Sequence, residues 1–171
     1  MKPVKINSRK LVEIYLKELK FSDKSEVHHI LFSQPESVAI LPIFDKDKVI
    51  MVKQFRYAIN EYSWEIPAGG IQEKESPEKA AMRELFEETG YKTSEINYVC
   101  SFYLSNSISD EKMNLYEARD LLKHETHAYS ELLETDIQIK IFEANELQNM
   151  LDNNIITDAT TIIAIQHFLA K

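Results

Sequence analysis

Glycine is scarce in this chain of 171 residues, which contains only Gly69, Gly70 and Gly90. All three fall between Gly69 and Tyr91, a stretch that also holds the densest cluster of carboxylates in the chain. Glycine permits tight turns and the close approach of the backbone to another group. The coincidence makes residues 69–91 the first place to look for a functional site.

Other absences narrow the class of protein. Cys100 is the only cysteine, so no disulfide can form within the chain, and its expected role is that of a small core residue. No apolar run approaches membrane-spanning length, and the first residues lack the hydrophobic core of a signal peptide. We therefore expect a cytoplasmic protein without a membrane partner.

Linkers, low-complexity runs and internal repeats are absent as well. The length is that of one domain, residues 1–171, and is sufficient for a proper core. Positive charge is in deficit, with 20 lysine and arginine residues against 28 acidic ones and a formal net charge of −8. This balance argues against binding to a nucleic-acid backbone, but a small anionic substrate can bind through metal ions and local basic groups.

Runs of apolar residues, some of them alternating with polar ones, predict strands on both sides of a central helix. The expected strands cover residues 12–17, 27–32, 37–44, 49–57, 96–103, 112–118 and 136–142. The expected helices cover residues 77–89, 145–152 and 158–169. This order of elements indicates an α/β sandwich.

Residues 76–90 carry the start and stop signals of a helix. Ser76 is a good N-cap, Pro77 suits the first helical position, and Gly90 can adopt the left-handed conformation that ends a helix. Helical periodicity places three carboxylates on one face, those of Glu84, Glu87 and Glu88. The other face gathers Met82, Leu85, Phe86 and Thr89. We expect one face to pack and the other to be acidic.

Three glutamates on a helix are most often an ordinary solvated surface. Here Glu84 and Glu88 are like charges four residues apart, which destabilise an isolated helix unless something positive is supplied. A hard divalent cation would resolve this repulsion, because Mg²⁺ takes a few carboxylates, keeps water ligands and accepts phosphate oxygens. The charges alone leave both interpretations open, and the surrounding motif favours the metal site.

The stretch from residue 69 to residue 91 resembles the Nudix box, the signature of hydrolases that cut a diphosphate linked to another moiety. Seven identities match at fixed spacing: Gly69, Glu75, Arg83, Glu84, Glu87, Glu88 and Gly90. Only the last position departs, since Tyr91 stands where the family usually has an aliphatic residue. The resemblance implies a Nudix-type α/β/α sandwich with a mixed β-sheet, in which the catalytic helix follows a glycine-containing loop.

The resemblance also implies roles for the box residues. Arg83 and Glu75 would hold the loop and the helix together through charged hydrogen bonds. Gly69 and Gly70 would permit a turn and a close approach of backbone to phosphate. The expected metal is Mg²⁺, with Mn²⁺ as the alternative. Its expected ligands are oxygen atoms of Ala68, Glu84, Glu87 and Glu88.

Flanking segments resemble one branch of the family more closely, the ADP-ribose pyrophosphatases and related nucleoside diphosphate sugar hydrolases. These segments are residues 54–57, 64–69 and 158–164. In this branch an N-terminal segment such as residues 1–36 commonly supplies strands that pair across a dimer, so a β extension and a homodimer are implied. The branch often has a Ser-Pro pair where this chain has Ser105-Asn106, which leaves the preference for ADP-ribose open.

Residues outside the box are candidates for substrate binding and proton transfer. The expected substrate-binding residues are Arg56, Trp64, Glu65 and Glu111. For Arg56 the alternative is a structural ion pair with Glu65, and for Trp64 it is a buried aromatic ring beside a strand. The candidate general bases, for which the alternative is a solvated loop acid, are Glu131, Asp136 and the preferred Glu134.

The leading interpretation is Mg²⁺-dependent hydrolysis of a nucleoside diphosphate sugar, with ADP-ribose giving AMP and ribose 5-phosphate. GDP-mannose or another nucleotide sugar is the alternative substrate. A Nudix-like sensor that binds a nucleotide sugar without cutting it is the rival from another class, and the retention of every box carboxylate favours the enzyme. A housecleaning or cap-hydrolysing relative would share the box, but the segment at 64–69 disfavours it.

Overall fold

The computed structural model describes residues 4–5, 13–20, 26–124 and 137–171. The described strands are β1 (Val4–Lys5), β2 (Glu13–Lys20), β3 (Glu26–Ser33), β4 (Ser37–Phe44), β5 (Lys48–Arg56), β6 (Glu61–Glu65), β7 (Ala68–Gly70), β8 (Tyr91–Lys92), β9 (Glu95–Tyr103), β10 (Lys112–Arg119), β11 (Leu122–Lys123) and β12 (Gln138–Glu143). The described helices are α1 (Pro77–Thr89), α2 (Ala144–Asp152) and α3 (Ala159–Leu169). None of these helices is long and apolar enough to cross a membrane.

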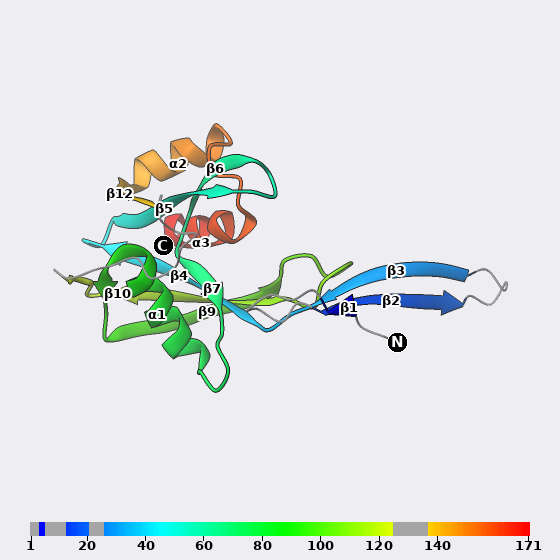
Figure 1. Cartoon of the computed structure of the whole chain (residues 1–171). Coiled ribbons are helices and arrows are strands. Elements are labelled where there is room, and N and C mark those ends of the chain that lie inside the picture. Colours follow the sequence, from blue (N-terminus) through cyan, green and yellow to red (C-terminus); the bar gives the residue numbers. More distant parts are fainter. Residues whose placement is uncertain (1–3, 6–12, 21–25, 125–136) are drawn as a thin grey trace.

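The main sheet is mixed and lies between two layers of helix. Its strands run in the order β12-β5-β4-β10-β9, with β4 parallel to β10 and the other neighbours antiparallel. Val38 and Ile40 of β4 pack with residues of α1, whereas Ala39 and Leu41 pack with residues of α2 and α3. Figure 1 shows α1 on one face of the sheet and the other two helices on the opposite face. The predicted α/β/α sandwich is confirmed.

The strands β4 and β5 form a fork. They pair with each other only beside their connecting turn, from Ile43 to Val49 and from Phe44 to Lys48. Farther along, β6 pairs with β5 and β7 pairs with β4, so residues 61–70 fill the space between the diverging strands. The sequence pattern did not predict β6 or β7.

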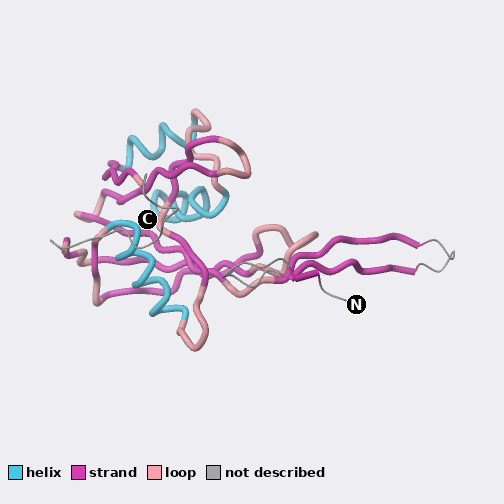
Figure 2. Tube along the Cα trace, viewed as in Figure 1, coloured by secondary structure: helices cyan, strands magenta, loops and turns pink. Residues whose placement is uncertain are grey.

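The strands β2 and β3 form a hairpin arm that projects from the rest of the fold (Figure 2). Cross-strand pairing places Leu16 beside Ile30 and Ile14 beside Phe32 on one face of the arm. Leu16 and Ile30 are 58% and 54% exposed, so much of this apolar face is open to solvent. At the base of the arm, Phe32 N donates a hydrogen bond to Ile108 O (2.7 Å).

The helix α1 begins and ends at the residues that the sequence predicts. Ser76 is the N-cap, and its Oγ accepts a hydrogen bond from Lys79 N (3.4 Å). Gly90 ends the helix with a φ of 75°, and its N donates to Phe86 O (2.9 Å). The left-handed conformation at Gly90 explains why glycine is suited to this position.

We expect Gly90→Ala to lower the free energy of unfolding by about 1–2 kcal/mol, because a Cβ in the left-handed conformation crowds the following carbonyl oxygen. Lys46→Gly is the matched control, since Lys46 already has a φ of 58° and glycine relieves this strain. Urea denaturation followed by circular dichroism measures both variants. A Gly90→Ala variant as stable as the wild type would rule out the left-handed helix end.

Candidate active site

Arg83 is the centre of the hydrogen-bond network around α1. Its Nε and Nη2 donate to the two carboxylate oxygens of Glu75, each at 2.9 Å. Nη2 also donates to Gly70 O (3.0 Å), and Nη1 donates to Glu84 (2.6 Å) and Glu87 (2.9 Å). One guanidinium group therefore connects β7, the loop before the helix and the acidic residues of the helix itself.

This network shifts the ionisation of both partners. Hydrogen bonds from Arg83 lower the pKa of Glu75, which outweighs the raising effect of desolvation. Hydrogen bonding to Glu75 in turn raises the pKa of Arg83, with Glu84 and Glu87 adding to the effect. The Gln72 N–H also donates to Glu75 Oε2 (3.0 Å). Glu75 is therefore held as a carboxylate at neutral pH.

Gly69 lies directly against the carboxylate of Glu84. A Cβ at position 69 would come within 2.1 Å of Glu84 Oε1 and 2.2 Å of its Cδ. Gly69 and Gly70 belong to the strand β7, and of the three glycines only Gly90 has a positive φ. The predicted turn at Gly69 and Gly70 is therefore wrong. A side chain at position 69 would displace the Glu84 carboxylate, which occupies the space beside Gly69.

The packed and acidic faces of α1 are not separate, contrary to the prediction. Glu84 and Glu88 are only 8% and 3% exposed and lie on the same stripe of the helix as Ala81 and Leu85, which are fully buried. Carboxylates on a packed stripe are costly unless a positive group compensates them, and Arg83 does so for Glu84. Two residues that were expected to pack are only partly buried, Met82 and Phe86.

Arg56 and Glu65 form an ion pair in the fork. Arg56 Nε donates to Glu65 Oε1 (2.9 Å), and Nη2 also contacts this carboxylate. These hydrogen bonds raise the pKa of Arg56 against the effect of desolvation, and the charges of Glu65, Glu88 and Asp158 contribute further. Arg56 thus lies within electrostatic reach of Glu88 on α1. Asp158 is also close enough to act on Arg56. The sequence predicted Asp158 at the start of the last helix but did not predict that it lies near Arg56.

The register of β7 directs the Ala68 carbonyl away from β4. Ile40 N of β4 donates a hydrogen bond to Pro67 O, and Ile71 N donates one to Glu36 O just before β4. The bonded positions of this segment therefore alternate with Ala68 and Gly70. The Gly70 carbonyl points to the same side and is bound by Arg83. The Ala68 carbonyl therefore lies along the edge of β7 that Arg83 also contacts.

Other predicted site residues have different surroundings. Trp64 packs against Phe142 in an edge-to-face arrangement, with ring centroids 4.9 Å apart. Both carboxylate oxygens of Glu111 are bound, one by Ser37 Oγ (2.7 Å) and the other by Gln34 Nε2. The candidate general bases lie outside the described residues: Glu131, Glu134 and Asp136.

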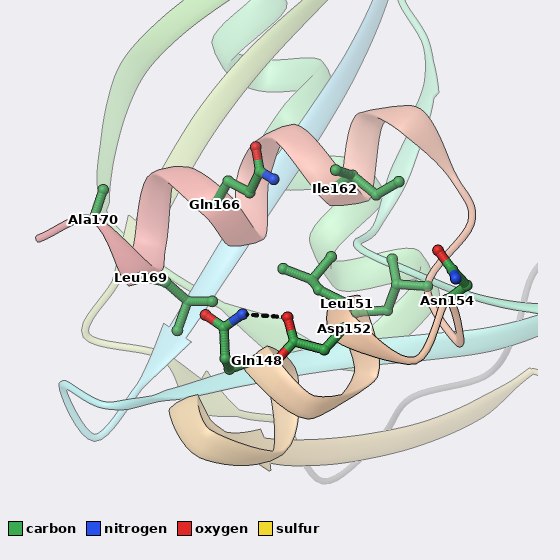
Figure 3. A pocket seen from close by; sticks show the side chains of 9 residues that line it. Gln148, Leu151, Asp152, Asn154, Ile162, Gln166, Leu169 and Ala170 are labelled. Atoms are coloured by element: carbon green, nitrogen blue, oxygen red, sulfur yellow. Dashed lines mark hydrogen bonds between the residues drawn. The ribbon is translucent and has the colours of Figure 1, made fainter.

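An open hollow of about 500 Å³ lies between α2 and α3 (Figure 3). Gln148 Nε2 donates to Asp152 Oδ1 (2.8 Å) at its edge. Since α2 and α3 cover the face of the sheet opposite to α1, this hollow is separate from the carboxylates of the helix. None of the predicted site residues lines it.

The donor atoms that α1 and β7 offer are of the kind that a hard divalent cation binds. Three carboxylates and the Ala68 carbonyl offer oxygen atoms, which are the ligands that Mg²⁺ and Mn²⁺ prefer. Within the described residues, no three acidic, histidine or cysteine side chains are already grouped as a metal site. Glu84 and Glu87 instead share Nη1 of Arg83, which supplies positive charge between them.

Comparison with known proteins decides the family. The model of the NUDIX domain matches residues 33–151 of this chain. The chain belongs to the Nudix family. It is 31% identical over 168 residues to the ADP-ribose pyrophosphatase of Bacillus subtilis (strain 168), an alignment that covers 97% of this chain and 89% of that protein. It is 30% identical over 169 residues to the methanol dehydrogenase activator of Bacillus methanolicus, with 98% and 90% covered.

A solved structure described as an ADP compounds hydrolase has the same fold as this Nudix chain. The two agree with a TM-score of 0.79 over 99% of this chain and 88% of the other, at 23% sequence identity. The resemblance seen in the sequence is thereby confirmed, and the protein is a Nudix pyrophosphohydrolase. Nudix hydrolases generally use divalent metal ions, in agreement with the oxygen donors described above.

We expect Glu75→Gln to lower the free energy of unfolding by about 2 kcal/mol at pH 7, because it removes a two-point charged contact with Arg83. Folding lowers the pKa of Glu75, so its contribution is present above the usual glutamate value of about 4.3 and is lost as the pH falls through the lower folded value. The difference between wild type and variant should therefore shrink below about pH 4.

Urea unfolding at a series of pH values measures this difference. Glu73→Gln is the matched control, because Glu73 is an exposed carboxylate in the same loop. A difference between wild type and Glu75→Gln that does not change with pH would show that the ionised contact is not its source.

Proposed function

We propose that this Nudix enzyme hydrolyses the diphosphate bond of a nucleoside diphosphate sugar, with ADP-ribose as the first candidate and AMP and ribose 5-phosphate as products. The observation that carries the proposal is the Arg83 network, which holds Glu84 and Glu87 beside β7 on the helix that also presents Glu88. The relative from Bacillus subtilis, which is similar over 97% of this chain, is named an ADP-ribose pyrophosphatase.

The carboxylates of Glu84, Glu87 and Glu88 and the Ala68 carbonyl would hold Mg²⁺, which supplies polarisation of the diphosphate and compensates the charge of the leaving phosphate. Arg83 fixes the carboxylates in position and is already occupied by four partners, so it is not assigned to the reacting phosphorus.

Arg56 and Glu134 are the proposed contacts to the substrate and the attacking water. Arg56 binds Glu65 through Nε and Nη2, so that its Nη1 can donate to a phosphate oxygen. Its side chain is 44% exposed, which makes this donation accessible from solvent. Glu134 is proposed to accept the proton of the attacking water, which then forms the new bond to phosphorus as the bridging oxygen departs.

Two alternatives differ from this proposal in substrate or in class. GDP-mannose or another nucleotide sugar would use the same diphosphate chemistry. A sensor would bind a nucleotide sugar without cutting it, and it would have no need for carboxylates on a packed stripe. The chain retains every carboxylate of the box, and it keeps Glu84 and Glu88 although both are buried, which favours the enzyme.

The decisive experiment separates the products formed from ADP-ribose, GDP-mannose, dinucleotides and nucleoside triphosphates with Mg²⁺ and with a chelator. We expect cleavage at the diphosphate of ADP-ribose or a related nucleotide sugar, slow cleavage of triphosphates, and no cleavage after chelation. Glu88→Gln should lower activity at least about a hundredfold, because a buried charge at the site is lost.

Glu78→Gln, which changes an exposed carboxylate in the first turn of the same helix, serves as the control and should keep wild-type activity. A preference for triphosphates would refute the substrate class. Binding of a nucleotide sugar without turnover would establish the sensor, and full turnover in metal-free buffer would remove the proposed metal site.

We further propose that the enzyme is a cytoplasmic homodimer and that the arm forms part of the interface. The apolar face of the arm contains Ile14, Leu16, Ile30 and Phe32, and it lacks a covering layer over Leu16 and Ile30 within the described chain. A second copy of the chain would remove this surface from water.

We expect Ile30→Glu to convert the dimer into a monomer at micromolar concentration, because it places a charge in the centre of this face. His29→Glu is the matched control, since His29 is exposed on the other face of the arm and pairs with Lys17. Light scattering after size-exclusion chromatography gives the mass. A wild type that is monomeric and fully active would overturn the proposed dimer.

A further inference from the structure

A chain of hydrogen bonds joins the start of α3 to the fork. The Ile66 N–H donates to Thr161 Oγ1 (3.1 Å), and this hydroxyl donates to Asp158 Oδ2 (2.7 Å). The same carboxylate oxygen accepts from Thr161 N (2.7 Å), so Asp158 is also the N-cap of the helix. Thr161 is fully buried, and its hydroxyl is used as both acceptor and donor.

Thr161 binds the short segment between β6 and β7, at which the chain crosses from one side of the fork to the other. Ile66 is 1% exposed, and with Pro67 it carries the chain from the β5 side of the fork to the β4 side. Pro67 O accepts a hydrogen bond from Ile40 N (2.9 Å). The crossing is therefore bound by α3 at Ile66 and by β4 at Pro67.

The residues on both sides of this crossing belong to the candidate site. Immediately before Ile66 is Glu65, which binds Arg56. Immediately after Pro67 come the Ala68 carbonyl and Gly69, against which the Glu84 carboxylate lies. A shift of the crossing would therefore move both Glu65, which binds Arg56, and Gly69, against which Glu84 packs.

The hydroxyl of Thr161 is needed to bind the crossing, but it is not needed to cap the helix. The cap of α3 is complete with the hydrogen bond from Thr161 N to Asp158, which any residue at position 161 other than proline could make. The buried Ile66 N–H, in contrast, has Thr161 Oγ1 as its acceptor and would lose it with the hydroxyl.

We propose that Thr161 and Asp158 are positioning residues for the hydrolysis, and that they hold the Ile66–Pro67 crossing so that Glu65, Ala68 and Gly69 keep their places around Glu84. This inference rests on the proposed function, which it deepens by assigning a role to the start of α3. Neither residue contacts the substrate or the metal in this role; both act through the backbone of the fork.

Three variants test the proposal. Thr161→Val removes the hydroxyl with little change of shape, Thr161→Ser restores the hydroxyl, and Thr160→Val removes a neighbouring buried hydroxyl that is outside this chain of hydrogen bonds. The measurements are kcat and KM for ADP-ribose, the Mg²⁺ concentration for half-maximal rate, and Mn²⁺ binding followed by electron paramagnetic resonance. Circular dichroism at the assay temperature confirms that each variant is folded.

We expect Thr161→Val to lower kcat about ten- to a hundredfold and to change KM less, because misplaced groups affect the reacting geometry more than ground-state binding. Both the half-saturating Mg²⁺ concentration and the Mn²⁺ dissociation constant should rise. Thr161→Ser should recover wild-type values within about twofold, and Thr160→Val should match the wild type. A Thr161→Ser variant as impaired as Thr161→Val would show that the hydroxyl does not restore the activity, and it would overturn the proposal.

Failure of the positioning role and failure of the proposed function give different results. If the wild type cleaves no nucleotide sugar, the proposed function fails, and unchanged Mn²⁺ binding in Thr161→Val would then overturn the positioning role as well. If the wild type cleaves ADP-ribose while Thr161→Val retains both kcat and Mn²⁺ affinity, only the positioning role is overturned. Weaker Mn²⁺ binding in Thr161→Val that Thr161→Ser reverses supports it in either case.

Discussion

A single guanidinium group, that of Arg83, joins three consecutive segments of the chain: the strand β7, the loop before α1, and α1 itself. It binds the loop carboxylate of Glu75, the carbonyl of Gly70 and two carboxylates of its own helix. Because these contacts use all three nitrogens, the helix cannot rotate or slide relative to β7 without breaking several charged hydrogen bonds at once. The position of the Glu84 carboxylate against Gly69 depends on this fixed placement of the helix relative to β7.

The carboxylates around Arg83 outnumber its single positive charge. Glu75, Glu84 and Glu87 bind one arginine, and Glu88 adds a further buried carboxylate on the same stripe. These four carboxylates share Arg83 and the charge of Arg56, which lies within electrostatic reach of Glu88. A divalent ion held by these carboxylates, as in the proposed metal site, would add positive charge and lower the repulsion among them.

The sequence was sufficient to predict the layers of the fold and the limits of the helix. Strong local signals account for this success: Ser76 and Gly90 act at single positions, and the apolar runs of β4 and β5 are long. The separation of packed and acidic faces was not predictable from periodicity, because periodicity assumes that charge faces water. Glu84 and Glu88 violate this assumption: both are buried, and Glu84 is paired with Arg83 and lies against Gly69 of β7.

The fork escaped prediction for a different physical reason. The strands β6 and β7 are short and are separated only by Ile66 and Pro67, so neither shows a sustained alternation of its own. Their pairing depends on the divergence of β4 and β5, and Ile66 is bound by Thr161, 95 residues farther along the chain. Contacts of this range are formed only when the layers assemble. The fork, which carries Arg56, Glu65 and Gly69, is therefore specified by the tertiary structure, whereas the helix that faces it is specified by its own sequence.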